Sequence, residues 1–238
     1  MRITVAARKG GVGKSSVVAG LASLVSGQGR RVLAVDLDPQ SNLAFMLGVD
    51  PTASGTAALL DGQDPEPLVV TKHLHVYPGG PELARQDIAR LDPEDLADAL
   101  EGAPYDVVLF DCPPGSEHLE RLGLVASDLA LVVTNAHPIA IVGAGRVLED
   151  LERRREKGRR GPGRWAIVMN MIDARRSLDR NVEAMLGDMG GGVPRFKIKQ
   201  DINLAMATAQ GILLEDYAPG SAAAKALGDV GRWCLGDA

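Results

Sequence analysis

The chain has 238 residues, of which 45 % are apolar, 24 % charged and only 3 % aromatic, a composition typical of one globular domain with an aliphatic core. Its net charge of −5 excludes a protein that is basic throughout, as a general nucleic-acid coat would be. No apolar run is long enough for a membrane helix or a signal peptide, and Cys112 and Cys234 form no CxxC pair, so we expect a cytoplasmic protein without disulfides or zinc.

The first elements in chain order are a strand, a glycine-rich turn and a helix. The apolar run "RITVAA" (2–7) predicts a buried strand, and "KSSVVAGLASLVSGQG" (14–29) has the apolar spacing of a helix that ends at glycine. Further short apolar runs predict strands at 31–36, 105–111 and 128–135. The run "RWAIVMNMID" (164–173) predicts one more.

Helix-length segments separate these strands. Asp92 is expected to cap a helix with Pro93 in its first turn, and 138–157 reads as a long amphipathic helix. Residues 50–90 read as loops and short helices, with a short strand at "LHVYP". Continuous apolar strands alternating with helices predict a doubly wound, mostly parallel α/β sheet with helices on both faces. We expect one domain over 1–238, with no DNA-reading domain ahead of the first strand.

The turn after the first strand, within "AARKGGVGKSS" (6–16), has the strand–loop–helix context of a P-loop. The backbone N–H groups of Gly11 to Lys14 are expected to converge on a β-phosphate at the positive end of the helix. Lys14 would span the β- and γ-phosphates, Ser15 would ligate Mg²⁺ and Ser16 would reach the α-phosphate.

Several motifs together resemble the ParA/MinD family of deviant Walker A P-loop ATPases. "RKGGVGKSS" (8–16) resembles its signature loop, "VLAVDLDPQSN" (32–42) its first switch, and "YDVVLFDCPPG" (105–115) its Walker B strand and second switch. "NMIDAR" (170–175) and "YAPGS" (217–221) continue the match in the same order. The resemblance implies a P-loop NTPase fold with ATP and Mg²⁺ as cofactors.

The same resemblance assigns roles to residues. Lys9 resembles the signature lysine that reaches across a face-to-face dimer to the partner's nucleotide, and Gly10 lacks a side chain where the facing subunit comes close. Asp38 resembles the residue that positions the attacking water, while Asp36 and Asp111 resemble those that complete the Mg²⁺ environment through water. The implied catalytic residues are Lys9, Lys14 and Asp38, and the implied nucleotide-binding residues are Gly10, Gly11, Val12, Gly13, Lys14, Ser15, Ser16, Asn170 and Pro219. The general P-loop pattern has glycine where this chain has Arg8, and the role of Arg8 is left open.

Two of the nucleotide contacts have alternatives. Asn170 resembles an adenine-contacting asparagine, although a cap at the end of a strand explains it as well. Pro219 lies where the family presents backbone to the base.

The end of the chain separates branches of the family. The segment "AAAKALGDVGRWCLGDA" carries only Lys225 and Arg232 as basic residues, too few for the membrane-binding helix of the MinD-like branch. Cys112 directly follows the Walker aspartate and Cys234 lies near the chain end, so the iron–sulfur branch is also excluded. The ParA branch remains, and we expect no membrane partner.

The charge distribution agrees with that branch. Residues 146–199 hold 14 Lys and Arg against 8 Asp and Glu, a local +6, which leaves 12 basic and 23 acidic residues elsewhere, a local −11. A solvated arginine-rich helix and loop would give the same count, and the run from Arg153 to Arg160 fits compensation of a helix dipole. The implied DNA-binding residues are Arg175, Arg176, Lys197 and Lys199, with the choice between the two lysines left open.

We therefore expect a slow, partner-stimulated ATPase that dimerises around ATP, binds DNA non-specifically and positions a cargo over the nucleoid. The cargo would be a plasmid, a chromosome or a protein compartment, held through a ParB-like or other adaptor. The alternatives are a MinD-like positioning ATPase and an ATP-dependent metabolic or maturation enzyme, such as an amidotransferase-type synthetase or a metallocentre chaperone.

Overall fold

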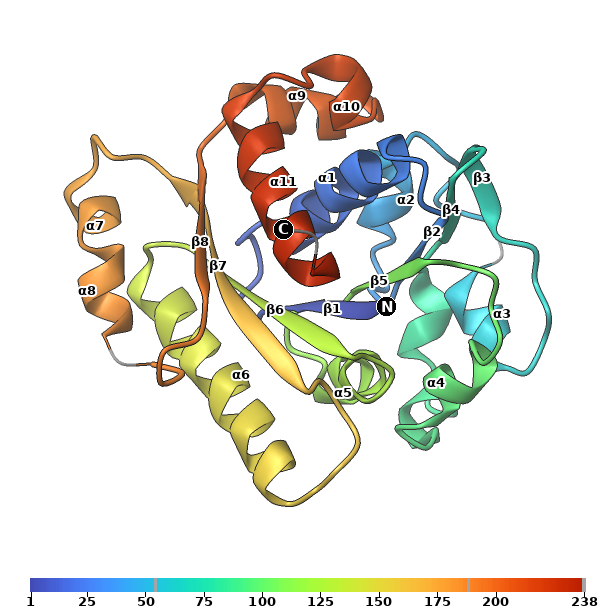
Figure 1. The fold of residues 1–238 in the computed structure, drawn as a ribbon. Helices are drawn as coiled ribbons and strands as arrows, with labels where there is room; N and C mark the ends of the chain where they lie inside the picture. Colours follow the sequence, from blue (N-terminus) through green and yellow to red (C-terminus); the bar gives the residue numbers. More distant parts are fainter. Residues whose placement is uncertain (54, 188, 237–238) are drawn as a thin grey trace.

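The structure is a computed structural model that describes residues 1–53, 55–187 and 189–236. Its centre is a sheet in the order β3-β4-β2-β5-β1-β6-β7-β8 (Figure 1). All neighbouring strands are parallel except β3 and β4. The strands are β1 (Arg2–Ala6), β2 (Val32–Asp36), β3 (Leu68–Thr71), β4 (Leu74–Tyr77), β5 (Val107–Asp111), β6 (Leu129–Thr134), β7 (Arg164–Ile172) and β8 (Arg195–Lys199).

Helices cover both faces of this sheet, which confirms the predicted doubly wound fold (Figure 1). One face carries α1 (Lys14–Gly27), α2 (Asn42–Met46), α9 (Ile202–Gln210), α10 (Leu214–Tyr217) and α11 (Ala222–Leu235). The other carries α3 (Thr56–Leu60), α4 (Asp95–Ala99), α5 (Glu117–Val125), α6 (Pro138–Glu156) and α8 (Val182–Leu186). The short α7 (Ser177–Arg180) precedes α8, and 3-10 turns lie at η1 (Pro81–Ala84) and η2 (Ile88–Arg90).

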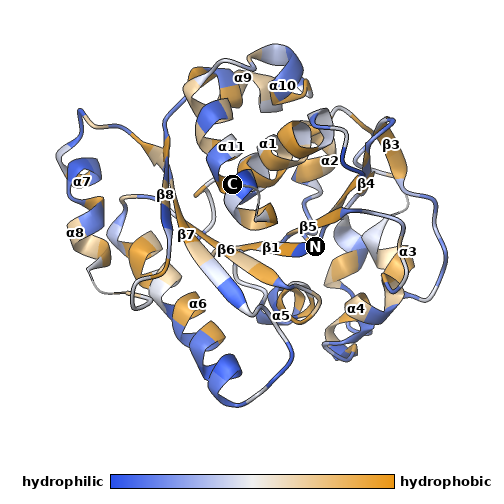
Figure 2. Cartoon of the chain, in the orientation of Figure 1, coloured by the Kyte–Doolittle hydropathy of each residue, from blue (hydrophilic) through white to orange (hydrophobic). Residues whose placement is uncertain are grey.

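The central strands are buried on both faces because helices cover both. Every residue of β2, β5 and β6 is buried, which explains why these strands read as continuous apolar runs rather than as alternating patterns (Figure 2). The helix α1 is buried along most of its length because it lies between the sheet and α11. Its Gly20 allows this approach, since a Cβ there would lie 2.5 Å from Leu227 Cδ1.

The C-terminal helix α11 has one apolar face, which packs on α1 and β8. Leu227, Val230 and Cys234 on that face are buried, while Lys225 and Arg232 are exposed. Among the described residues, no helix is long and apolar enough to cross a membrane.

Two details differ from the sequence prediction. Asp92 does not cap a helix: its carboxylate accepts the Glu94 N–H at 3.0 Å in a turn, and α4 begins only at Asp95. The edge strands β3 and β8 were not predicted. In β8, exposed Lys197 and Lys199 flank the buried Ile198, so the strand lacks the apolar run that marks the central ones.

Gly48 is expected to be essential for stability. Its φ of +77° suits glycine, and a Cβ there would lie 2.3 Å from the Gly211 carbonyl oxygen, where the end of α2 meets the end of α9. Left-handed backbone and a clash with main chain together predict a loss of about 2–4 kcal/mol of unfolding free energy for Gly48→Ala. The measurement is the midpoint of urea unfolding.

Gly62→Ala is the matched control. Gly62 has a similar φ of +73° but nothing within 4 Å of its added Cβ, so the expected loss is only about 1 kcal/mol. Equal losses in the two variants would contradict the packing argument.

Candidate functional site

The candidate site lies at the carboxyl edge of the central parallel strands, where ligands bind in open α/β sheets. The loop between β1 and α1 lies at this edge, and β1 is flanked by β5 and β6. Asp36 and Asp111 end the neighbouring strands β2 and β5 in the same register, and Asn170 lies near the end of β7. The fold therefore brings together side chains far apart in sequence.

The loop from Gly11 to Lys14 has the conformation of an anion cradle. Gly11 has a φ of 75° and Gly13 a φ of 85°, and no side chain caps the first turn of α1. A Cβ on Gly13 would also lie 2.3 Å from Asn170 Nδ2 and 3.0 Å from Met171 Cε. The uncapped N–H groups at the start of α1 are thus available to an anion.

The predicted phosphate-binding side chains sit at the start of the same helix. Lys14 is 6 % exposed, Val12 is buried, and Ser15 and Ser16 are half-buried. A buried ammonium at a helix N-terminus requires negative charge nearby, and Lys14 lies close enough to Asp111 to lower the pKa of that carboxyl.

Asp111 is a buried carboxyl of the site whose oxygens lack hydrogen-bond partners. It is 1 % exposed, and neither carboxylate oxygen has a hydrogen-bond partner of normal geometry. Burial raises the pKa of Asp111 to about 7, against the smaller opposing influence of Ser15 and Lys14. An unsatisfied buried carboxylate of this kind fits a hydrated cation close to Ser15.

Asp36 is buried beside Asp111 but is engaged by backbone. Its two oxygens accept the Asp38 N–H at 2.8 Å and the Leu43 N–H at 3.1 Å. Burial first, and then the charge of Asp111, raise the pKa of Asp36 well above its ordinary value. Asp36 therefore fixes the segment 36–43, and its predicted role near Mg²⁺ stays a prediction.

The described residues contain no group of three or more His, Cys, Asp or Glu that could hold a metal by itself. Mg²⁺ in proteins is often bound mainly through phosphates, a hydroxyl and water. The uncapped helix start, buried Lys14 and unpaired Asp111 fit a Mg²⁺–nucleotide.

Asp38 lies in the turn after β2 and is half-buried. Its Oδ1 accepts the Gln40 N–H at 2.9 Å, and its carbonyl oxygen accepts the Gly80 N–H at 3.3 Å. A Cβ on Gly79 would lie 2.1 Å from that carbonyl oxygen. This supporting loop was not predicted, although the Pro-Gly-Gly run directly after a strand is a turn signal in the sequence.

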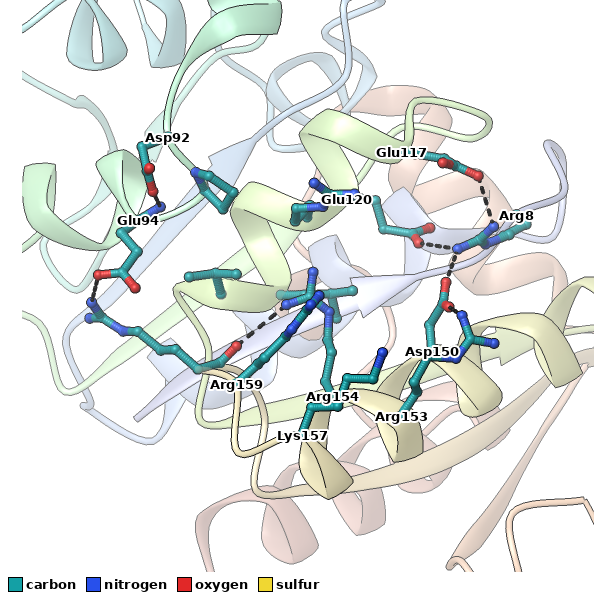
Figure 3. Close-up of a pocket in the computed structure, with 15 residues that line it drawn as sticks. Arg8, Asp92, Glu94, Glu117, Glu120, Asp150, Arg153, Arg154, Lys157 and Arg159 are labelled. Atoms are coloured by element: carbon teal, nitrogen blue, oxygen red, sulfur yellow. Dashed lines mark hydrogen bonds and ion pairs between the residues drawn. The ribbon is translucent and has the colours of Figure 1, made fainter.

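Arg8, whose role the sequence left open, anchors the loop to two helices (Figure 3). Its guanidinium donates to Glu117 of α5 at 3.2 Å, to buried Glu120 of α5 at 3.5 Å, and to Asp150 of α6. The structure therefore gives Arg8 the role that the sequence left open: three carboxylates hold the residue next to Lys9.

Unlike Arg8, Lys9 and Gly10 are not held by ion pairs to the residues that the structure describes. Lys9 is half-buried and forms no ion pair with any residue that the structure describes. Gly10 is exposed, and a Cβ there would make only ordinary contacts, the nearest being Pro114 at 3.7 Å. The fold of a single chain thus gives no reason for glycine at position 10.

The two predicted base-contacting residues lie in different environments. Asn170 is 2 % exposed, and its Nδ2 donates to the Val12 carbonyl at 2.9 Å, so it braces the phosphate loop. Pro219 is exposed in the turn between α10 and α11. The start of α11 is tied to the start of α9, because the Ala223 N–H donates at 2.8 Å to Asp201, the N-cap residue of α9.

The predicted DNA-binding residues gather at the β8 side of the sheet. Arg175 is 90 % exposed and pairs with Asp173 at 2.8 Å, holding the pKa of Asp173 at about 2. Arg176 is exposed in the same loop, before α7. Lys197 and Lys199 lie on the exposed side of β8, where Lys197 pairs with Glu183 of α8 at 3.5 Å.

Comparisons with known proteins agree on the kind of protein that this chain resembles. A model described as an AAA domain, AAA_31, matches residues 1–160. The chain is 35 % identical over 228 residues to the chromosome-partitioning ATPase Soj of Thermus thermophilus, covering 94 % of this chain and 91 % of the relative. It is 31 % identical to the chromosome partitioning protein ParA of Caulobacter vibrioides, covering 78 % and 76 %.

Solved structures share the fold over nearly the whole chain. Cyanothece McdA in complex with ATP has a TM-score of 0.85 at 23 % identity and covers 99 % of this chain and 96 % of its own. The septum site-determining protein MinD of Pyrococcus horikoshii with Mg-ADP has a TM-score of 0.79 at 25 % identity, covering 98 % and 94 %. Cobyrinic acid a,c-diamide synthase of Mycobacterium smegmatis, with an ATP analogue and magnesium, has a TM-score of 0.80 at 27 % identity, covering 99 % and 94 %.

Asp111→Asn is expected to stabilise the chain in EDTA by about 1–3 kcal/mol at pH 8, because it removes an unsatisfied buried charge. The folded state raises the pKa of Asp111 from the ordinary 3.8 to about 7, so it binds this proton more tightly than the unfolded state does. The parent should therefore lose unfolding free energy as pH rises from about 4 to about 7.

Urea unfolding at pH 5 and pH 8 tests this expectation. The variant should show less of the decline, whereas Asp98→Asn, which removes an exposed carboxyl, should keep it. An equal decline in parent and Asp111→Asn would show that Asp111 is already compensated in the folded chain.

Proposed function

The chain belongs to the ParA/MinD family of P-loop ATPases, and we propose from this premise that it is an ATP-dependent positioning switch. In the proposal it dimerises around ATP, binds DNA without sequence preference and releases it after hydrolysis. The observation that carries the proposal is the signature loop. In it, buried Lys14 is the first residue of the uncapped helix α1, and Lys9 has no ion-pair partner among the described residues.

The first part of the proposal is binding of ATP with Mg²⁺. The N–H groups of Gly11 to Lys14 and the Lys14 ammonium would hold the phosphates, with Asn170 and Pro219 near the base. Ser15 would ligate Mg²⁺, and Asp111 and Asp36 would accept hydrogen bonds from its waters. When bound, Mg²⁺ supplies charge neutralisation of the phosphate oxygens. The Mg-ADP and ATP-analogue complexes of the neighbouring structures support this assignment.

Asp38 is proposed to orient the attacking water. Its backbone is fixed by the loop at Gly79 and Gly80, while its carboxylate is engaged only by the backbone of its own turn among the residues described. Phosphoryl transfer needs positioning and charge compensation more than covalent chemistry, so one carboxylate suffices for slow turnover. A partner that orders this turn would accelerate the reaction.

Lys9 is proposed to reach the γ-phosphate of the partner's ATP in a face-to-face dimer. A cation about 4 Å from a phosphate charge gains about 4 kcal/mol at an effective dielectric of 20. That gain falls when the γ-phosphate is lost, so hydrolysis would loosen the dimer. Exposed Gly10, which the single chain does not require, fits a close approach by the second subunit.

DNA binding is proposed for the basic side chains around β8. With about three phosphate contacts per protomer the salt slope is near −2.7, and a dimer doubles both the contacts and the slope. Dimerisation would thus switch a weak binder into a firm one. No sequence readout is needed, because such contacts are made to phosphates rather than bases.

The names of the relatives suggest the biological setting. Soj and ParA are described as chromosome-partitioning proteins, so we propose a cytoplasmic, nucleoid-associated protein that positions a chromosome or similar cargo through an adaptor. The likeness to a cobyrinic acid a,c-diamide synthase favours the alternative of a small-molecule enzyme. Stimulation of ATP turnover by DNA and adaptor supports the switch, whereas stimulation by a small acceptor supports the alternative.

Three substitutions separate binding, dimerisation and hydrolysis. Lys14→Ala should abolish ATP binding, because it removes the buried cation of the cradle. Lys9→Ala should retain ATP binding but weaken ATP-dependent dimerisation at least tenfold. Asp38→Ala should retain both and lower turnover by about 100-fold or more, which traps the dimer. Nucleotide titration, light scattering with a non-hydrolysable ATP analogue and phosphate release measure the three steps.

Each proposed site has a result that would refute it. Full turnover in Lys14→Ala and Asp38→Ala would refute their assignment. If light scattering detects only single chains with the analogue at every concentration, the dimer is refuted even where ATP is hydrolysed.

Charge reversal at Arg175 should weaken DNA retention and leave ATP-dependent dimerisation intact. The expected change is a shallower salt dependence of DNA binding, by about one unit per lost contact. Arg90→Glu is the control, since Arg90 is an exposed arginine in η2, outside the β8 side of the sheet. Equal loss in both variants, or equal DNA binding with ADP and ATP, would contradict the proposal.

A further inference from the structure

A second charged recess lies beside the candidate site, on the face that carries α5 and α6. It is a groove of about 470 Å³ between α5, the C-terminal half of α6 and the turn that precedes α4 (Figure 3). Seven basic and five acidic side chains line it, with only three apolar ones. Arg8 forms the end of the groove nearest the phosphate loop (Figure 3).

Four of the five acidic side chains of the groove form ion pairs. Glu117, Glu120 and Asp150 pair with Arg8. Asp150 also pairs with Arg153 at 3.2 Å, and Glu94 pairs with Arg160 at 3.2 Å. The remaining carboxylate, that of Asp92, accepts the Glu94 N–H at 3.0 Å.

The other cations of the groove have no such partner. Within residues 1–53, 55–187 and 189–236, no ion pair is formed by the four members of what we call the open cluster: Arg121, Arg154, Lys157 and Arg159. Arg154 is half-buried, and its side chain donates to the Arg160 carbonyl at 3.4 Å. Burial lowers the pKa of Arg154 most, and the charge of Arg121 lowers it further. The charge of Asp150 opposes this shift, and that of Arg159 adds to it.

Basic side chains outnumber acidic ones in the groove by seven to five, and gathering like charges costs free energy, so the open cluster attracts an anion. We propose that this groove binds a compact, multiply charged anion of the phosphate class, held by the guanidinium groups of Arg121, Arg154 and Arg159. Guanidinium groups donate two parallel hydrogen bonds to phosphate oxygens, and a ligand with several charges matches several cations in a small volume.

The shape and the rim of the groove argue against other anions. A DNA duplex would bring a continuous phosphate backbone past Glu94 and Glu117, which are about half and three-quarters exposed. An acidic peptide would also need hydrogen-bond partners for its backbone N–H and C=O groups. The charged side chains that line the groove are poorly suited to pair with a peptide backbone. The volume lies within the range of small-molecule sites, and it fits a short polyphosphate or a nucleotide-sized phosphate ester.

Calorimetric titration of the full chain with inorganic pyrophosphate tests the proposal. The background is Lys14→Ala, which removes anion binding at the phosphate loop, so that the result does not depend on the proposed ATPase function. Saturable binding with one site per chain is expected. Adding Arg121→Ala and Arg154→Ala should weaken it at least tenfold, whereas Arg154→Lys should weaken it less.

Arg146→Ala is the matched control, because Arg146 is an exposed arginine on the same helix α6 that does not line the groove. It should leave the affinity unchanged, and circular dichroism should show every variant folded. Absence of binding in the Lys14→Ala background, or the same loss in Arg146→Ala, would overturn the proposal. Competition by a glutamate-rich peptide or a DNA duplex at lower concentration than pyrophosphate would overturn the phosphate class.

Discussion

Asp36 and Asp111 end neighbouring strands in the middle of the sheet, where burial and their mutual repulsion disfavour two charged carboxylates and Lys14 partly offsets the charge of Asp111. Around this charge the chain builds the rest of the site. The Asp36 oxygens fix the turn that carries Asp38, the Asp111 oxygens stay free, and the start of α1 stays uncapped. Without a ligand, this arrangement lowers the free energy of unfolding. Binding of a cation together with an anion would raise it again.

The sequence predicted the parts of the molecule that depend on local patterns. Continuous apolar strands such as β5 and the spacing of the phosphate loop are visible in the sequence because burial on two faces and a tight turn each demand particular residue types. The edge strand β8 and the Arg8 network were not predicted. A half-exposed strand has no apolar run, and the partners of Arg8 lie 109 to 142 residues away, so only the fold brings them together.

The basic sector that is contiguous in sequence is divided in space. Arg175 and Lys197 lie at the β8 side of the sheet, whereas Arg153 and Arg154 belong to the groove beside α5. Composition alone could not separate the two, because α6 and β7 carry the chain from one region to the other (Figure 1). The arginine run is therefore more than compensation of the α6 dipole: Arg153 and Arg160 form ion pairs, and Arg155 stacks on Trp165 at 4.9 Å.

The strand β8 forms one edge of the sheet, where a second molecule can approach. A strand at the border of a sheet exposes unpaired main-chain groups that invite another chain to add on, and lysines at such a border discourage that growth. Lys199, which forms no ion pair with any described residue, would repel the same border of a neighbouring molecule, whereas Lys197 is paired with Glu183. Neighbouring copies of the chain would therefore resist joining into fibres through the β8 edges of their sheets.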